Sequence, residues 1–139
     1  MKKLLVLLLI IFTYNTGWGA MSFFEKSKLA EANKLYEEQK YDEALGVYQE
    51  LRDKYIDNAL AWYGMGAIFY ANKMYDKAID KFQTAIKLDP NFSTAMYWLG
   101  NAYEKNGDKQ EAVKYWKMAL EKNSKNEEAK NRLKAAGTK

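Results

Sequence analysis

The sequence predicts an all-α protein built from a recurring pair of helices, and three observations lead to this fold class. Related side chains recur every 34 residues, as in Ala44, Ala78 and Ala112. Apolar residues within each copy follow the i, i+3, i+4, i+7 spacing of one helical face. The 139 residues include one proline and eight glycines, so few of them interrupt regular structure. This length is sufficient for one domain with its own hydrophobic core.

Residues 1–20 have the layout of a secretory signal peptide. A basic start is followed by an apolar run and then by small residues, in the order Lys2-Lys3, Leu4 to Phe12, Gly17, Gly19 and Ala20. The apolar run is shorter than the ~20 residues that cross a bilayer, so we expect cleavage, with Gly19 as the favoured site. An uncleaved anchor is the alternative. The protein is therefore expected to be exported, as a periplasmic or secreted chain or one tethered to the membrane.

Residues 21–139 read as one repeat domain, with copies at 25–58, 59–92 and 93–126. Four columns of side chains keep the period: Ala44, Ala78 and Ala112; Ala32, Gly66 and Gly100; Tyr48, Phe82 and Trp116; and Leu35, Phe69 and Tyr103. Four independent columns over three copies indicate true repetition of one structural unit.

Each copy reads as two amphipathic helices joined by a short turn. The second copy has one apolar face around Met65 and another around Phe82, with a turn between them at residues 72–74. Asp89-Pro90 ends its second helix, because proline excludes the preceding residue from helical geometry. In the third copy, Asn106-Gly107 predicts a helix end. Ser22 with Glu25, and Asp108 with Glu111, predict capping boxes at two helix starts.

The small side chains recur at places where two helices are expected to approach closely, because close approach requires that neither helix carries a bulky group there. The column of Gly66 is therefore expected to face the column of Ala78, with the aromatic column filling the space between copies. Residues 127–136 predict a final capping helix whose one large apolar residue is Leu133. Such a helix covers the last copy and keeps a polar outer face.

On these residues the sequence resembles the tetratricopeptide repeat (TPR) family over about residues 25–126. The second copy carries most of the motif, at Trp62, Met65-Gly66, Phe69, Ala78, Phe82, Ala85 and Pro90. The third copy has Leu99-Gly100, Tyr103, Ala112, Trp116 and Ala119, and the first copy is weaker. The resemblance implies a right-handed α-solenoid of three helix-turn-helix tetratricopeptide repeats plus a C-terminal capping helix.

The resemblance also implies that certain positions of each first helix line a concave groove that binds a peptide segment of a partner protein. Six residues at these positions form the predicted peptide-binding groove: Asn33, Tyr36, Tyr63, Tyr70, Tyr97 and Asn101. Tyrosine combines a large contact area with a polar tip, and asparagine can pair with a peptide backbone. The expected function is a protein–protein interaction scaffold in the cell envelope. The alternative for the tyrosines is that they cover the edge of the core.

Composition argues against several other classes of protein. Without histidine or cysteine, the sequence lacks the usual proton-transfer residue and the usual zinc ligands. We therefore expect no enzyme, no metal and no cofactor. Apart from Lys2 and Lys3, 20 basic residues stand against 18 acidic ones, which gives no electrostatic footprint for nucleic acid.

Two further expectations concern association. Open ends of a repeat array can stack, so a self-assembling structural scaffold, and hence a homo-oligomer, is the alternative function. Membrane association through the N-terminus is the other open expectation.

Overall fold

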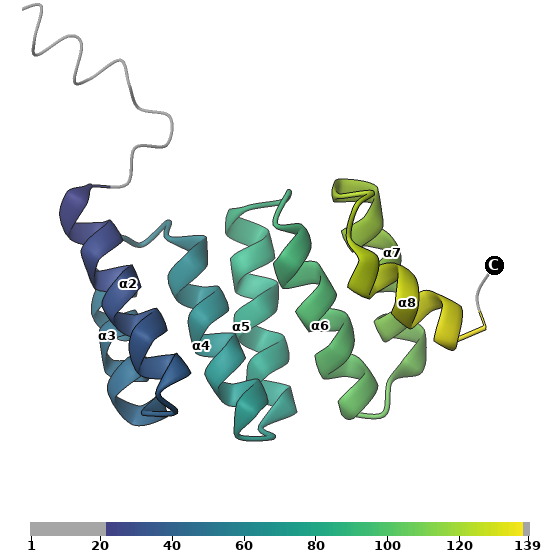
Figure 1. Ribbon diagram of the computed structural model, residues 1–139, viewed down its shortest axis with the longest axis horizontal. Helices are drawn as coiled ribbons and strands as arrows, with labels where there is room; N and C mark the ends of the chain where they lie inside the picture. The colour runs from purple at the N-terminus through teal and green to yellow at the C-terminus, as the bar shows by residue number, and fades with distance from the viewer. Residues whose placement is uncertain (1–21, 138–139) are drawn as a thin grey trace, which may run out of the picture.

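The computed structural model describes residues 22–137, and this range contains helices and connecting turns without a strand (Figure 1). The predicted signal peptide lies outside the described residues. The helices in chain order are α2 (Phe23–Glu37), α3 (Tyr41–Lys54), α4 (Ala59–Ala71), α5 (Tyr75–Leu88), α6 (Ser93–Lys105), α7 (Lys109–Lys122) and α8 (Glu127–Ala135).

Three antiparallel helix pairs follow one another along the molecule, as α2 with α3, α4 with α5 and α6 with α7 (Figure 1). Neighbouring pairs pack because each second helix contacts the first helix of the next pair. The predicted all-α helical-repeat solenoid is confirmed.

Four of the seven helices within residues 22–137 begin after a residue whose side chain caps them, at Ser22, Asn58, Asp108 and Asn126. At α2 the predicted capping box is present, since the Ser22 hydroxyl accepts from the backbone of Glu25 and the Glu25 side chain accepts from the backbone of Ser22. At α7 only half of the predicted box forms. Asp108 accepts from the backbone of Glu111, whereas the Glu111 carboxylate binds Lys114 instead. A lysine one turn along the helix therefore competes successfully for this carboxylate.

The turns inside the three pairs use one left-handed residue at the same place in each copy. Gln39 and Lys73 have φ of 60°, and Gly107 has φ of 95°. These residues are 34 apart, so the turn geometry is repeated although the residue type is not. Glycine adopts this conformation readily, whereas a side chain with a Cβ is strained in it.

We expect Lys73→Gly to raise the free energy of unfolding by roughly 0.5–1 kcal/mol, because the strain of the left-handed residue is larger than the added entropy of glycine in the unfolded chain. Urea unfolding followed by circular dichroism measures the change. Lys77→Gly, inside α5, is the matched control and should lower stability. Equal destabilisation by both changes would contradict the turn argument.

The glycines at positions 66 and 100 make room for the aromatic residue of their own copy. A Cβ on Gly66 would lie 2.7 Å from the Phe82 ring, and one on Gly100 would lie 2.6 Å from the Trp116 ring. At Gly100 the alanine column is close as well, since this Cβ would lie 3.0 Å from the backbone oxygen of Ala112.

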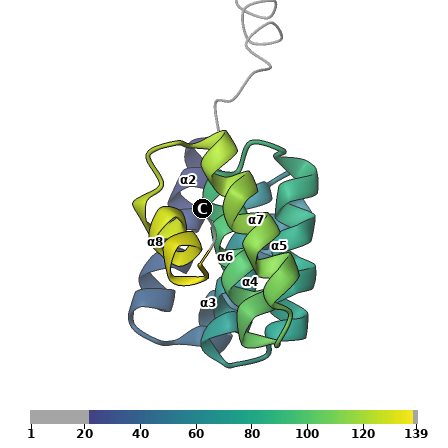
Figure 2. The same cartoon turned by 90° about the vertical axis from the view of Figure 1, so that its right-hand side faces the viewer.

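Helix α8 covers the end of the array at the predicted place. Ala129 and Leu133 pack against the cluster that contains Trp116. Figure 2 shows α8 on the side of α2, with α5 and α7 on the opposite side. None of the helices α2–α8 combines the length and hydropathy needed to cross a membrane.

Candidate functional site

The first helices of the pairs form one continuous surface, because α2 contacts α4 and α4 contacts α6. All six predicted groove residues lie on these three helices. Asn33 and Tyr36 are on α2, and the other four are on α4 and α6, at Tyr63, Tyr70, Tyr97 and Asn101. The four tyrosines are half-buried, so each keeps part of its ring accessible.

A cavity of about 180 Å³ opens between the first helices, and four of the six predicted residues line it. We call it the aromatic cavity; its lining consists of Asn33, Tyr36, Tyr48, Tyr63, Gly64, Ala67, Tyr70 and Trp98. None of these side chains is an acid, lysine or arginine. The cavity therefore suits an uncharged apolar or aromatic group with a few polar contacts at its edge.

Aromatic rings continue from this cavity onto the next helix pair. The ring centroids of Tyr70 and Trp98 lie 5.2 Å apart, and those of Trp98 and Tyr97 lie 5.5 Å apart, both pairs edge-to-face. Tyr36 contacts Tyr41 with ring centroids 5.5 Å apart and the ring planes tilted by 50°. These ring contacts restrict the side-chain rotamers, so little side-chain entropy is left to lose on binding.

Each of the two predicted asparagines accepts a hydrogen bond from the aromatic-column residue of its own copy. The Tyr48 hydroxyl donates to the Oδ1 of Asn33 at 2.5 Å, and the Trp116 Nε1 donates to the Oδ1 of Asn101 at 3.0 Å. In the middle copy the equivalent residues are Ala67 and Phe82. An amide thus occurs where the aromatic partner has a hydrogen to donate, and an alanine where it has none.

The two asparagines differ in their accessibility. Asn33 is exposed and lines the aromatic cavity, whereas Asn101 is 1% exposed. A bound segment can reach Asn33 directly. Asn101 lies beneath the surface, where its hydrogen bond positions Trp116. Direct contact between Asn101 and a peptide stays a prediction.

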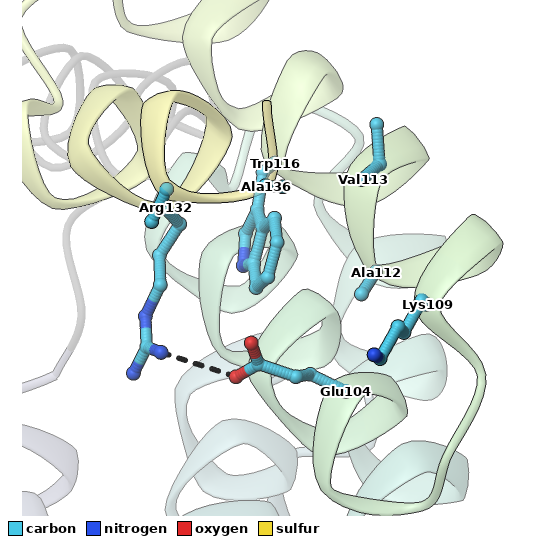
Figure 3. Close-up of a pocket in the computed structure, with 8 residues that line it drawn as sticks. Glu104, Lys109, Ala112, Val113, Trp116, Arg132 and Ala136 are labelled. Atoms are coloured by element: carbon cyan, nitrogen blue, oxygen red, sulfur yellow. Dashed lines mark hydrogen bonds and ion pairs between the residues drawn. The ribbon is translucent and has the colours of Figure 1, made fainter. Parts of the chain in front are cut away.

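The C-terminal end of the array offers a different environment at three positions that are aromatic one repeat earlier. Tyr70, Tyr75 and Trp98 are replaced, 34 residues later, by Glu104, Lys109 and Arg132. Arg132 and Glu104 form an ion pair of 3.1 Å (Figure 3). These three residues border a second cavity of about 350 Å³, the tail cavity, whose other lining residues are Ala112, Val113, Trp116, Ala135 and Ala136.

Burial also shifts the titration of two tyrosines at the aromatic cavity. Removal from water disfavours the phenolate and raises the pKa of both Tyr48 and Tyr63 to about 12. Neighbouring tyrosines add to the effect at both residues. Both hydroxyls therefore stay protonated well above neutral pH, and that of Tyr48 donates its hydrogen to Asn33.

We expect the free energy of unfolding to fall as the pH rises from about 10 to about 12. In this window the unfolded chain loses phenolic protons that the folded chain keeps at Tyr48 and Tyr63, so the folded state loses stability. Below about pH 10 the tyrosines are protonated in both states and this contribution is fully present. Urea unfolding at several alkaline pH values measures the slope. Tyr63→Phe should flatten it, and an unchanged slope in this variant would contradict the assignment.

Four residues of the aromatic cavity are not among the six predicted ones: Tyr48, Gly64, Ala67 and Trp98. Tyr48 belongs to the core column, Gly64 lies inside a helix, and Trp98 adjoins a predicted groove position. One signal was present, because Gly64 stands 34 residues before Trp98. A glycine at the position where the next copy has a tryptophan indicates that the space of a large side chain is left empty beside this helix. No cluster of acidic residues within 22–137 is arranged to hold a metal ion.

The fold and its inner surface define a helical-repeat protein with an aromatic cavity between its first repeats. Tetratricopeptide repeat profiles match residues 19–55 and 93–126, and a TPR repeat profile matches residues 66–107. The chain belongs to the tetratricopeptide repeat family.

Relatives in this family differ greatly in length. A TPR repeat-containing protein of Methanocaldococcus jannaschii is 33% identical over 100 residues, which cover 72% of this chain and 18% of that protein. The photosystem I assembly protein of Acaryochloris marina is 30% identical over 115 residues, covering 70% of this chain and 69% of its own length. The chain thus spans less than a fifth of the first relative and about two thirds of the second.

Two similar solved structures contain a bound peptide. The first TPR of Spaghetti (RPAP3) bound to an HSP90 peptide has a TM-score of 0.77 at 24% identity, covering 86% of this chain and 94% of that one. The Yersinia enterocolitica type III secretion chaperone SycD in complex with a peptide of the translocator YopD has a TM-score of 0.72 at 21% identity. That match covers 84% of this chain and 89% of SycD. At these identities the likeness concerns the fold.

Proposed function

We propose that this protein binds a peptide segment of a partner protein along its concave surface, with an uncharged apolar or aromatic side chain in the aromatic cavity. The observation that carries the proposal is the lining of that cavity, in which four of the six predicted groove residues meet without a charged group. The peptide complexes of Spaghetti and SycD support the proposal through their shared fold.

The side chains that line the aromatic cavity determine which side chain of a peptide segment can bind there. Rigid tyrosine rings offer contact area at little cost in side-chain entropy, and their hydroxyls can pair with a peptide backbone. A carboxylate or ammonium group entering the cavity would lose its hydration without gaining a charged partner. The segment therefore places a neutral side chain there, and its charged residues lie toward the ion pair of Glu104 and Arg132.

Binding tests the proposal with the double variant Tyr63→Ala, Tyr97→Ala. A random peptide library displayed on phage and panned on the immobilised chain should be enriched in uncharged aromatic and aliphatic residues. The double variant should bind the selected peptides at least about tenfold more weakly, the loss expected when two aromatic contacts are truncated. Fluorescence anisotropy of labelled peptides measures the affinity.

A matched control separates loss of the groove from loss of the fold. Tyr103 and Tyr115 stack on each other with centroids 5.5 Å apart and lie outside the aromatic cavity. Tyr103→Ala with Tyr115→Ala removes the same number of rings and should leave peptide affinity within about twofold, since its changes lie off the contact surface. If Tyr63→Ala, Tyr97→Ala keeps its helical circular dichroism and binds as the wild type does, the groove is not the site.

The proposed location is the cell envelope, on the strength of residues 1–20. N-terminal sequencing of the chain recovered from fractionated cells tests it. Cleavage after Gly19 predicts a mature chain that begins at Ala20 in the exported fraction, whereas an intact Met1 in the membrane fraction indicates an anchor. Recovery of an intact chain from the cytosol would refute the location and leave the binding proposal standing.

A further inference from the structure

The tail cavity lies at a place that is occupied in the preceding repeat by an aromatic side chain of the next first helix. Helix α8 keeps the register of the first helices, since its N-cap Asn126 stands 68 residues after Asn58, the N-cap of α4. In this register Gly137 follows the column of Leu35, Phe69 and Tyr103. Helix α8 has 9 residues against 13 in α4 and α6, and Gly137 has φ of 72°.

In the preceding helix pair, an aromatic side chain occupies the place that corresponds to the tail cavity. Tyr103 packs against the cluster of Ala78 and Phe82, and its hydroxyl accepts a hydrogen bond of 2.9 Å from the Gln83 Nε2. The equivalents of Ala78 and Phe82 are Ala112 and Trp116, and both line the tail cavity. Both residues are buried, yet the surface that packs under an aromatic ring in one copy borders a cavity in the next (Figure 3).

The opposite end of the molecule presents large apolar side chains. Phe23 is 89% exposed, Phe24 is 41% exposed and Ile56 is 75% exposed. We call these three residues the head patch. A hydrogen bond of 3.2 Å between the hydroxyls of Ser22 and Tyr55 ties the start of α2 to the turn that carries Ile56. The Lys54 Nζ lies 3.7 Å from the centroid of the Phe24 ring, so Phe23 and Ile56 are the most exposed apolar groups at this end and the candidates for an interaction surface.

The two ends also carry opposite charge. Residues 22–58 contain six basic and nine acidic side chains, a net charge of −3. Residues 93–137 contain nine basic and six acidic side chains, a net charge of +3. Complementary charge orients an encounter between the acidic head of one molecule and the basic tail of another, and it opposes head-to-head and tail-to-tail contact.

We propose that the head patch of one copy docks into the tail cavity of a second copy, with Phe23 taking the place of the aromatic ring that is absent at Gly137. The tail cavity of about 350 Å³ has room for such a ring. The contact uses two different surfaces, so the association continues from copy to copy, as an open chain or as a closed ring.

A membrane surface is the other candidate to cover the head patch, and charge disfavours it. Anionic headgroups attract basic segments, whereas the first helix pair has a net charge of −3. The second copy is therefore the occupant that the observations favour, and binding to lipid becomes an outcome of the test.

The absence of cysteine from the sequence allows a direct test by cross-linking. Single-cysteine chains, Ser27→Cys and Ala136→Cys, carry different tags and are mixed with a short bismaleimide. Ser27 is exposed on α2 one turn after Phe23, so the head chain keeps its docking ring. Head-to-tail docking predicts a mixed cross-linked dimer in several-fold excess over that from Ser27→Cys with Asp80→Cys, whose side chain is exposed in the middle of the molecule. The excess should fall with rising salt, because screening weakens attraction between the charged ends.

Two further changes make the result specific. Adding Ile56→Glu to the head chain, or Val113→Trp to the tail chain, should remove the excess of mixed dimer. Circular dichroism verifies that each variant is folded. Ile56→Glu alters only an exposed side chain, so it should leave the fold intact. A yield equal to the Asp80→Cys control overturns the proposal, as does preferred cross-linking of either chain to itself. Without the mixed dimer, flotation with phosphatidylglycerol vesicles that Phe23→Glu abolishes would assign the head patch to lipid instead.

Discussion

Phe82→Ala is expected to lower the free energy of unfolding by about 3–5 kcal/mol, the largest effect of any substitution considered for this chain. Phe82 is fully buried and packs between the helices of the second and third pairs. Its loss leaves a cavity that the surrounding helices fill only partly. Because small domains have a total stability of about 5–15 kcal/mol, urea unfolding of this variant should show a strongly lowered midpoint.

A second substitution identifies the contact responsible. In the wild type, Gly66→Ala should destabilise, because the added Cβ would lie 2.7 Å from the Phe82 ring. In Phe82→Ala the ring is gone, and the same change should stabilise by up to about 1 kcal/mol through the better helix propensity of alanine. This reversal of sign is the result to look for in the double-mutant cycle. The same effect of Gly66→Ala in both backgrounds would show that ring and glycine are uncoupled.

Gly64→Ala is expected to cost about 1–3 kcal/mol, although the change improves helix propensity. A Cβ at this position would lie 2.3 Å from the Tyr48 ring, which is 3% exposed and held by Asn33. Gly46→Ala is the matched control, because Gly46 also lies inside a helix and nothing within 4 Å would meet its Cβ. That variant should be more stable than the wild type by up to about 1 kcal/mol.

The same pair of variants tests the proposed binding site. Gly64→Ala places a methyl group in the lining of the aromatic cavity and displaces Tyr48, so the affinity for a bound segment should fall with stability. Gly46→Ala lies outside that lining and should leave affinity unchanged. Thermal unfolding and fluorescence anisotropy measure the two effects. Stability gains of similar size in both variants would show that the Tyr48 ring gives way easily.

Much of the candidate site was predicted from the resemblance to the tetratricopeptide repeat family, and the remainder depended on contacts across helices. Tyr36, Tyr63 and Tyr70 were predicted to share one surface, and they line one cavity. Spacing could not show that Asn101 is buried, because burial depends on the neighbouring α7. The hydrogen bond that Asn101 accepts from Trp116 joins residues 15 apart, and periodicity along one helix contains no such information.

The sequence by itself determined the secondary structure, the length of the repeat, the pairing of helices and the caps at several helix ends. These properties depend on residues within one 34-residue unit, whose faces and turns recur in the chain. Only the tertiary structure decided which glycine faces which ring, where a cavity opens and which asparagine remains accessible. Those properties depend on the volumes of side chains brought together from neighbouring units, and a difference such as Gly64 against Trp98 acquires its meaning only when the helices pack.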